Sequence, residues 1–206
     1  GGQLTAQGVP PDESPWIDEF KTGATQSYRA MREGIRAYYR TYYPLLKAHR
    51  ENPHLNPGMG SVSPITHEPK IGLAVLEGML SPYLASGKLR LWLEHKPLKA
   101  EVQGDRVTAI SLQDSRSGQE RTVLFDYVLD ATELGDLLPL AEVEHVIGAE
   151  SQAQTGEMHA LSGDPDPLDQ QAISWCFALD YFPGEDHRIE RPEDYDCWRD
   201  YQADFW

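Results

Sequence analysis

Several side chains in this sequence could bind a metal ion or perform acid–base chemistry. Glu185, Asp186 and His187 are three ligand types in a row, but they follow Pro183 and Gly184 in a polar loop, where a charged run is usually just solvated. None of the seven histidines stands at the i, i+4 or His-x-His spacing that metal sites favour. The sequence therefore predicts no metal site.

Two other patterns that could serve catalysis have simpler explanations. His67 and Glu68 stand directly before Pro69, a residue suited to an early helical position, and so predict a polar cluster at a helix N-terminus rather than an acid–base pair. A hydrolase with a nucleophile elbow would need Gly-x-Ser-x-Gly, which the sequence lacks. Cys176 and Cys197 are too far apart for a Cys-x-x-Cys motif and are expected to be buried, unreactive thiols.

The most informative stretch is residues 129–137, which read Leu-Asp-Ala-Thr-Glu-Leu-Gly-Asp-Leu. If a buried strand ends here, the small side chains of Ala131 and Thr132 would let a flat cofactor or its phosphates approach the backbone closely. Gly135 and Asp136 stand at the entrance of a predicted helix over 137–141 and would combine backbone N–H donors with an acidic side chain. In the alternative interpretation, Asp136 simply caps that helix.

The composition excludes two classes of partner. The 206 residues include 18 Lys+Arg and 33 Asp+Glu, for a formal charge of −15, and such a field repels a phosphate backbone. No apolar run approaches the roughly 20 residues that a membrane-spanning helix needs. We therefore expect neither nucleic-acid binding nor a membrane span. The length suits one domain or slightly more.

Hydrophobic spacing predicts two helices in the first half of the chain. Apolar residues recur at helical intervals from Thr25 to about Tyr43. A second helix should begin near Pro69 and be bent or ended at Pro82, with Gly87 as the stop signal. The stretch 52–63 between them is rich in Pro, Gly, Asn and Ser and predicts a loop.

After residue 87 the hydrophobic period changes from 3.6 to 2, which is typical of strands. The predicted strands cover 89–94, 98–102, 107–112, 122–125 and 127–130. A Gly-Asp turn within 103–106 should join the second and third as a hairpin, and 115–118 should form the next turn. The result is an antiparallel meander between a half-buried strand and a short buried strand.

This order of elements resembles the FAD-binding domain of flavoproteins of the glutathione-reductase type. Residues 129–137 are similar to the sequence hydrophobic-Asp-Ala-Thr-x-x-Gly-Asp-Leu, which ends the return strand in one family of FAD-dependent oxidoreductases. Residues 1–5 resemble that family's Gly-Gly-x-x-Thr/Ser segment, which passes beneath the flavin, and the helix after His67 resembles the helix before its adenine-side strand. The resemblance covers residues 1–148 well and the remainder loosely.

The resemblance implies a mixed α/β fold. Residues 1–148 would form the middle portion of a Rossmann-like FAD-binding domain, with its three-stranded antiparallel meander, and 149–206 the start of a substrate-side domain. It implies FAD as cofactor, with Leu98 facing the adenine through backbone groups. The cofactor-binding residues it implies are Gly1, Gly2, Gln3, Leu4, Thr5, Leu98, Ala131, Thr132, Gly135 and Asp136.

Two departures from the family's pattern stand out. The family begins with a strand, a Gly-x-Gly-x-x-Gly turn and a helix that holds the cofactor's pyrophosphate, and this sequence has no such unit. Its one Gly-x-Gly, at Gly58 and Gly60, lies in a loop without a preceding strand. The chain is therefore expected to be a fragment lacking that N-terminal unit. The second departure is Glu133, where many relatives have Gly.

The final third of the chain has a different sequence pattern. The apolar run 173–179 predicts a buried strand. The aromatic residues around and after it would form ordinary core or, alternatively, a pocket wall over the flavin; they are Trp175, Phe177, Tyr181, Tyr195, Trp198, Tyr201 and Trp206.

The function implied by the resemblance is that of an FAD-dependent oxidoreductase, which transfers a hydride or electrons to or from a small-molecule substrate. No residue is assigned as acid, base or nucleophile. The alternative is a non-catalytic binding or structural module that keeps part of the flavoprotein fold. We expect another chain, or the missing parts of the same polypeptide, to complete the sheet, and the cytoplasm is the favoured compartment.

Overall fold

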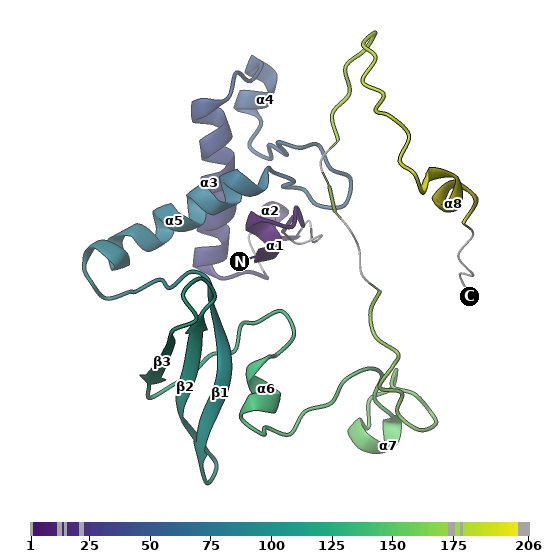
Figure 1. Cartoon of the computed structure of the whole chain (residues 1–206). Coiled ribbons are helices and arrows are strands. Elements are labelled where there is room, and N and C mark those ends of the chain that lie inside the picture. Colours follow the sequence, from purple (N-terminus) through teal and green to yellow (C-terminus); the bar gives the residue numbers. More distant parts are fainter. Residues whose placement is uncertain are drawn as a thin grey trace.

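The computed structural model describes residues 2–11, 14, 16–20, 23–172, 176–177 and 179–201. A helical part comes first, then a small antiparallel sheet, and then a long segment with little packing around it (Figure 1). The helical part contains α1 (Gly2–Thr5), α2 (Trp16–Glu19), α3 (Gln26–Tyr42), α4 (Lys47–Glu51) and α5 (Pro69–Ala85).

Helix α3 confirms the helix predicted from apolar spacing. Thr25 is its N-cap, with extended backbone and a side-chain oxygen that accepts a hydrogen bond from Tyr28 N at 3.2 Å, which satisfies one of the free N–H groups of the first turn. Its buried face carries Met31, Ile35 and Tyr39. These residues form the core together with Leu55, Ile65 and Ile71.

Helix α5 crosses α3 (Figure 1) and begins at Pro69, as predicted. The crossing is close: a Cβ on Gly34 would lie 2.8 Å from Val75 Cγ1, so only glycine fits there without displacing its neighbour. Pro82 does not end the helix, which continues to Ala85. Gly87 follows at a φ of 72° and terminates the segment.

The predicted meander is confirmed. Strands β1 (His95–Gln103), β2 (Arg106–Asp114) and β3 (Glu120–Leu124) pair antiparallel in that order. Gly104 turns the first hairpin at a φ of 59°, a conformation that costs glycine little. The pairing of β1 with β2 shifts between Pro97 and Lys99, so Leu98 is the extra residue of a β-bulge.

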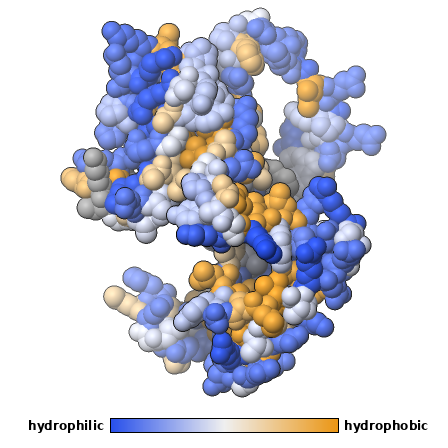
Figure 2. Space-filling model, turned by 90° about the vertical axis from the view of Figure 1, so that its left-hand side faces the viewer, coloured by the Kyte–Doolittle hydropathy of each residue, from blue (hydrophilic) through white to orange (hydrophobic). Residues whose placement is uncertain are grey.

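Two predicted strands are wrong. Residues 89–94 and 127–130 lie outside every strand among the described residues, and Leu93 and Leu129 are 71% and 91% exposed. A strand needs a neighbour for its N–H and C=O groups, and none of the described strands pairs with either segment. Figure 2 shows hydrophobic surface gathered in broad patches on one face of the molecule.

The C-terminal third carries short helices α6 (Leu137–Leu140), α7 (Gln152–Thr155) and α8 (Tyr195–Asp200). Helix α6 confirms the helix predicted over 137–141. Positions 173–175 and 178 of the predicted buried strand lie outside the described residues, as does Trp206. Phe177 and Leu179 are 72% and 84% exposed, in contrast to the buried strand expected there.

The aromatic residues of this region do not form the core expected of them. Tyr181, Trp198 and Tyr201 are exposed in the described part of the chain, because the extended segment brings little apolar surface against them. The prediction of two buried thiols is also wrong, since Cys197 is exposed and Cys176 is partly buried. Cys176 lies beside Gly8, which brings the late segment against the residues that follow α1.

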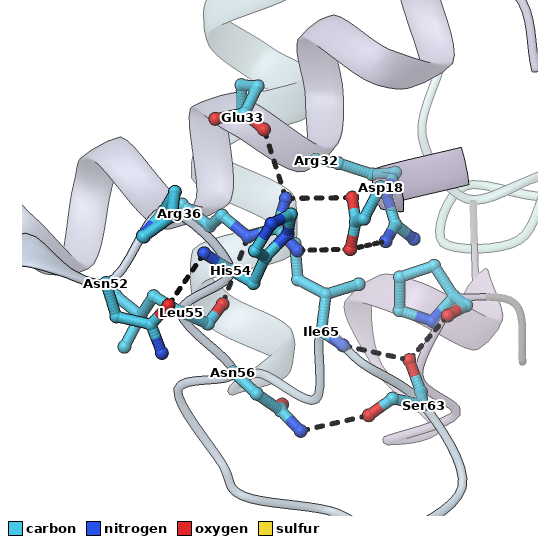
Figure 3. Close-up of polar contacts among 12 residues, drawn as sticks. Asp18, Arg32, Glu33, Arg36, Asn52, His54, Leu55, Asn56, Ser63 and Ile65 are labelled. Atoms are coloured by element: carbon cyan, nitrogen blue, oxygen red, sulfur yellow. Dashed lines mark hydrogen bonds and ion pairs between the residues drawn. The ribbon is translucent and has the colours of Figure 1, made fainter. Parts of the chain in front are cut away.

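A buried ion cluster ties α2 to α3 (Figure 3). Asp18 Oδ2 accepts hydrogen bonds from Arg32 Nη2 and Arg36 Nη2, both at 2.6 Å, and Asp18 Oδ1 accepts one from Arg36 Nη1 at 3.0 Å. Both arginine side chains are 1% exposed. Burial would raise the pKa of Asp18, but the hydrogen bonds from Arg36 and Arg32 prevail and hold it below its ordinary value.

Candidate functional site

The structure brings two of the predicted cofactor segments together. A hollow of about 430 Å³ lies between α1, the turn after residue 130 and the start of α3. Its lining residues are Gln3, Leu4, Pro10, Pro11, Tyr28, Ala131, Thr132 and Glu133. Gln3 Nε2 donates a hydrogen bond to Glu133 Oε2 at 3.2 Å, which links the two walls across 130 positions of sequence.

Helix α1 is held at this hollow by close packing on α5 (Figure 1). A Cβ on Gly72 would lie 2.8 Å from Leu4 O and 2.6 Å from His67 Nε2. Gly72 is buried in the first turns of α5, so its missing side chain is what lets the backbone of α1 approach. Gly2 is close to the opposite wall, where a Cβ would lie 3.5 Å from Glu133 Oε1.

The second wall is a turn organised by Asp130. Its Oδ1 accepts hydrogen bonds from Thr132 N at 2.9 Å and Thr132 Oγ1 at 2.7 Å, and its Oδ2 accepts one from Leu137 N at 3.0 Å. Thr132 Oγ1 in turn accepts a hydrogen bond from Asp136 N at 2.7 Å. The hydrogen bonds to Asp130 lower its pKa below the ordinary value, and the bond from Thr132 N is the largest cause.

The alternative in which Asp136 simply caps the helix after it is wrong. Although Asp136 occupies the N-cap position of α6, its side chain makes no capping hydrogen bond to the described residues of that helix. Asp130, six positions earlier, serves the N-terminus of α6 instead, because its carboxylate accepts from Leu137 N. Gly135, at a φ of 68°, gives the turn the left-handed residue that it needs.

Most of the predicted site residues that the structure describes lie at or beside this hollow. Gln3, Leu4, Ala131 and Thr132 line it, whereas Gly2, Thr5, Gly135 and Asp136 lie in the adjoining α1 and turn segments. Gly1 lies outside the described residues. Leu98 is partly buried in β1 and is not among the lining residues that the structure describes.

Sequence reasoning missed several of the lining residues. Pro10 and Pro11 predict by their type only a turn. Tyr28 fits the helical spacing between Thr25 and Tyr43, which predicts a half-buried helix face. Glu133 departs from the family pattern, but nothing in its type or spacing predicts Gln3 as its hydrogen-bond partner. Their role follows from tertiary packing, which local patterns do not encode. The hydrogen-bonding side chains of Asp130 and Thr132 were the one available signal, since Asp-x-Thr is a common local turn motif.

The hollow is polar and carries no positive charge on its described lining. Gln3 and Thr132 offer an amide and a hydroxyl, and Glu133 is the one carboxylic acid among the described lining residues, which include no Lys, Arg or His. Such a lining suits uncharged hydrogen-bonding groups, because the carboxylate of Glu133 would oppose a phosphate.

A second polar cluster joins the end of α3 to the start of α5. Glu68 accepts hydrogen bonds from Tyr39 OH at 3.1 Å, from Tyr43 OH, and from Lys70 Nζ at 2.7 Å. Glu68 N in turn donates to Tyr39 OH at 2.9 Å. Of the polar pair predicted at this helix N-terminus, Glu68 belongs to the cluster, whereas His67 Nδ1 lies 3.1 Å from Ile65 O instead. The hydrogen bonds from Lys70 and then Tyr43 lower the pKa of Glu68.

Replacing Glu68 with glutamine should make stability less sensitive to acid. A carboxylate whose pKa is lowered by folding contributes stability above its ordinary value of 4.5, and this contribution is lost as the pH falls through the lowered folded-state value. Thermal unfolding midpoints at pH 6 and pH 3 should therefore differ less for E68Q than for the wild type. The control is E77Q, an exposed position of the same helix. An E68Q difference equal to that of the wild type would contradict the assignment.

The residues at 185–187 interact with one another and with their neighbour. His187 Nε2 lies 2.7 Å from Glu185 Oε2, and Asp186 pairs with Arg188 at 2.5 Å, all on exposed side chains. In the described part of the chain no group of three or more His, Cys, Asp or Glu side chains could hold a metal ion. No described helix combines the length and apolar character needed to cross a membrane.

Comparison with known proteins identifies the family. The family model described as FAD dependent oxidoreductase matches residues 1–205, almost the whole chain. No curated protein and no solved structure matches the chain. The match agrees with the mixed α/β fold. The chain therefore belongs to the family of FAD-dependent oxidoreductases, and its cofactor is FAD.

Proposed function

We propose that this chain belongs to an enzyme that transfers a hydride or electrons between FAD and a small-molecule substrate, and that the hollow between α1 and the turn at 130–136 contacts the cofactor. The observation that supports the proposal is the meeting of Gln3 and Leu4 with Ala131, Thr132 and Glu133 around one hollow. When bound, FAD supplies the redox chemistry through its isoalloxazine ring, and the protein supplies position and electrostatics.

The residues at the hollow fit the uncharged part of the cofactor. The Gln3 amide can hydrogen-bond to the ribityl hydroxyls or the polar edge of the ring system, and the small side chain of Ala131 leaves the backbone accessible. The Thr132 hydroxyl, whose hydrogen is donated to Asp130, can accept one hydrogen bond from a ribityl hydroxyl. Glu133 and the absence of positive charge on the described lining disfavour the pyrophosphate there. The roles of Gly1, Gly2, Thr5, Leu98, Gly135 and Asp136 toward FAD remain part of this proposal.

The pyrophosphate would be held by a strand–turn–helix unit that this sequence lacks. We propose that such a unit, from the same polypeptide or from another chain, pairs with residues 89–93 and 127–130. Support comes from the apolar side chains that these segments leave uncovered, with Leu91, Trp92, Leu93, Tyr127 and Leu129 all more than a third exposed. We also propose that the chain belongs to the subgroup marked by Asp-Ala-Thr-x-x-Gly-Asp-Leu. A domain boundary near residue 148 is part of the same proposal.

The first test is whether the purified protein retains a flavin. A visible absorbance spectrum taken before and after addition of FAD and desalting should contain the flavin bands. The same measurement on the product of the whole coding region decides whether a further unit is needed. A whole-gene product that stays colourless and leaves FAD unbound would refute the function proposed here.

Replacing Thr132 with valine should weaken flavin retention about tenfold or more. The change removes the hydroxyl that donates to Asp130 and accepts from Asp136 N, so two hydrogen bonds of the turn are lost, each worth roughly 1 kcal/mol. The matched control is T108V in β2, where the hydroxyl donates to Glu101 O away from the hollow. Fluorescence titration with FAD measures both affinities, and equal affinities would exclude the turn from the cofactor site.

A further inference from the structure

Ser63 is a buried polar residue outside the hollow that reaches one of its walls. Ser63 is only 2% exposed. Ser63 Oγ donates a hydrogen bond to Pro11 O at 2.6 Å and accepts one from Ile65 N at 3.2 Å (Figure 3). Pro11 lines the hollow with its neighbour Pro10, so this hydroxyl acts directly on the backbone of the wall.

The loop that carries Ser63 is tied by hydrogen bonds to α3 and across its own span. Arg36 Nε donates to Leu55 O at 3.0 Å, which fixes the start of the loop to α3 (Figure 3). Asn56 spans the loop, donating from Nδ2 to Ser63 O at 3.1 Å and accepting from Thr66 N at Oδ1, at 2.7 Å. These hydrogen bonds fix the position of Ser63, whose hydroxyl also accepts a hydrogen bond from the core residue Ile65.

The wall itself needs such an external hydrogen bond. Pro10 and Pro11 lack backbone N–H groups, so this pair can be tied down only through its carbonyl oxygens or by packing. Pro11 is buried, and a buried carbonyl without a donor costs about 1–3 kcal/mol. The donor that satisfies Pro11 O is Ser63 Oγ, 52 positions later in the chain.

We infer that Ser63 is a positioning residue for the hollow: its hydroxyl fixes the Pro10–Pro11 wall at the distance from the turn at 130–136 that the cofactor requires. This inference rests on the proposed assignment of the hollow to FAD. Ser63 does not line the hollow in the described structure and acts through Pro11.

The test compares S63A, S63T and S61A. S63A removes the donor, S63T restores a hydroxyl, and S61A makes the same change at an exposed serine of the same loop. In the flavin-loaded protein we expect S63A to bind FAD about fivefold or more weakly and to change the visible circular dichroism of the bound flavin. S63T should recover both properties, and S61A should match the wild type. Unchanged affinity and dichroism in folded S63A would overturn the inference.

A second measurement does not depend on the cofactor. Hydrogen exchange of the backbone amides in residues 3–9 should be faster in S63A than in S61A, while the amides of α3 keep their wild-type rates. Unchanged exchange in residues 3–9 would overturn the positioning role even if no flavin is bound. Absence of FAD binding by the wild type, together with the expected exchange, would refute the proposed function but leave the link between Ser63 and the wall in place.

Discussion

Replacing Asp18 with asparagine should lower the free energy of unfolding by about 3–5 kcal/mol, the range found when one partner of a buried ion pair is removed. The carboxylate of Asp18 accepts hydrogen bonds from both Arg32 and Arg36, whose side chains are 1% exposed. Asparagine keeps the shape but supplies no negative charge and only one acceptor oxygen. Two buried guanidinium groups would then lose the carboxylate that they share.

The measurement is urea unfolding at neutral pH, with E19Q as the matched control. Glu19 is the next residue of α2 and is exposed, so its neutralisation should change the unfolding free energy by less than about 0.5 kcal/mol. Because folding lowers the pKa of Asp18, its contribution is present above the ordinary value of 3.8 and is lost as the pH falls below it. The difference in the free energy of unfolding between the wild type and D18N should therefore become smaller in acid. A gap below 1 kcal/mol at pH 7 would mean that the cluster contributes little.

Elements defined by local signals could be predicted from the sequence. The cap at Thr25, the proline at the start of α5 and the glycines at 87 and 104 act within a few residues, so α3, α5 and the β1–β2 hairpin follow from local rules. The segments 89–94 and 127–130 have equally clear strand patterns. They are not strands here because pairing depends on a neighbour elsewhere, and alternation alone cannot supply one.

The residues of the candidate site likewise fall into those predicted by local signals and those placed by distant contacts. The short motif at 129–137 predicts Ala131 and Thr132. Its hydrogen bonds join Thr132 to Asp130, so they lie within a few residues of sequence. Pro11 is held at the hollow by a hydrogen bond from Ser63, 52 positions later, and Tyr28 lines the hollow from α3. Such residues are defined by contacts between distant segments, and no spacing rule predicts them.

Replacing Gly72 with alanine should destabilise the protein by about 1–3 kcal/mol, the usual cost of forcing an extra methyl group into a packed site. The new Cβ would lie 2.8 Å from Leu4 O and 2.6 Å from His67 Nε2, and the first of these is backbone that cannot rotate away. Relief requires that α1 move off α5. Since Gln3 and Leu4 line the hollow, flavin retention should fall together with stability.

Gly78 provides the matched control in the same helix. A Cβ there would meet nothing within 4 Å, so G78A should stabilise the protein by about 0.5–1 kcal/mol, because alanine loses less backbone entropy than glycine on entering a helix. The two substitutions are chemically identical and should have opposite signs in urea unfolding. If G72A were also stabilising, the close approach of α1 to α5 would be wrong, and with it the packing that holds Gln3 against Glu133. If G72A lost stability but kept its affinity for FAD, α1 would be a structural support and the cofactor would be bound elsewhere.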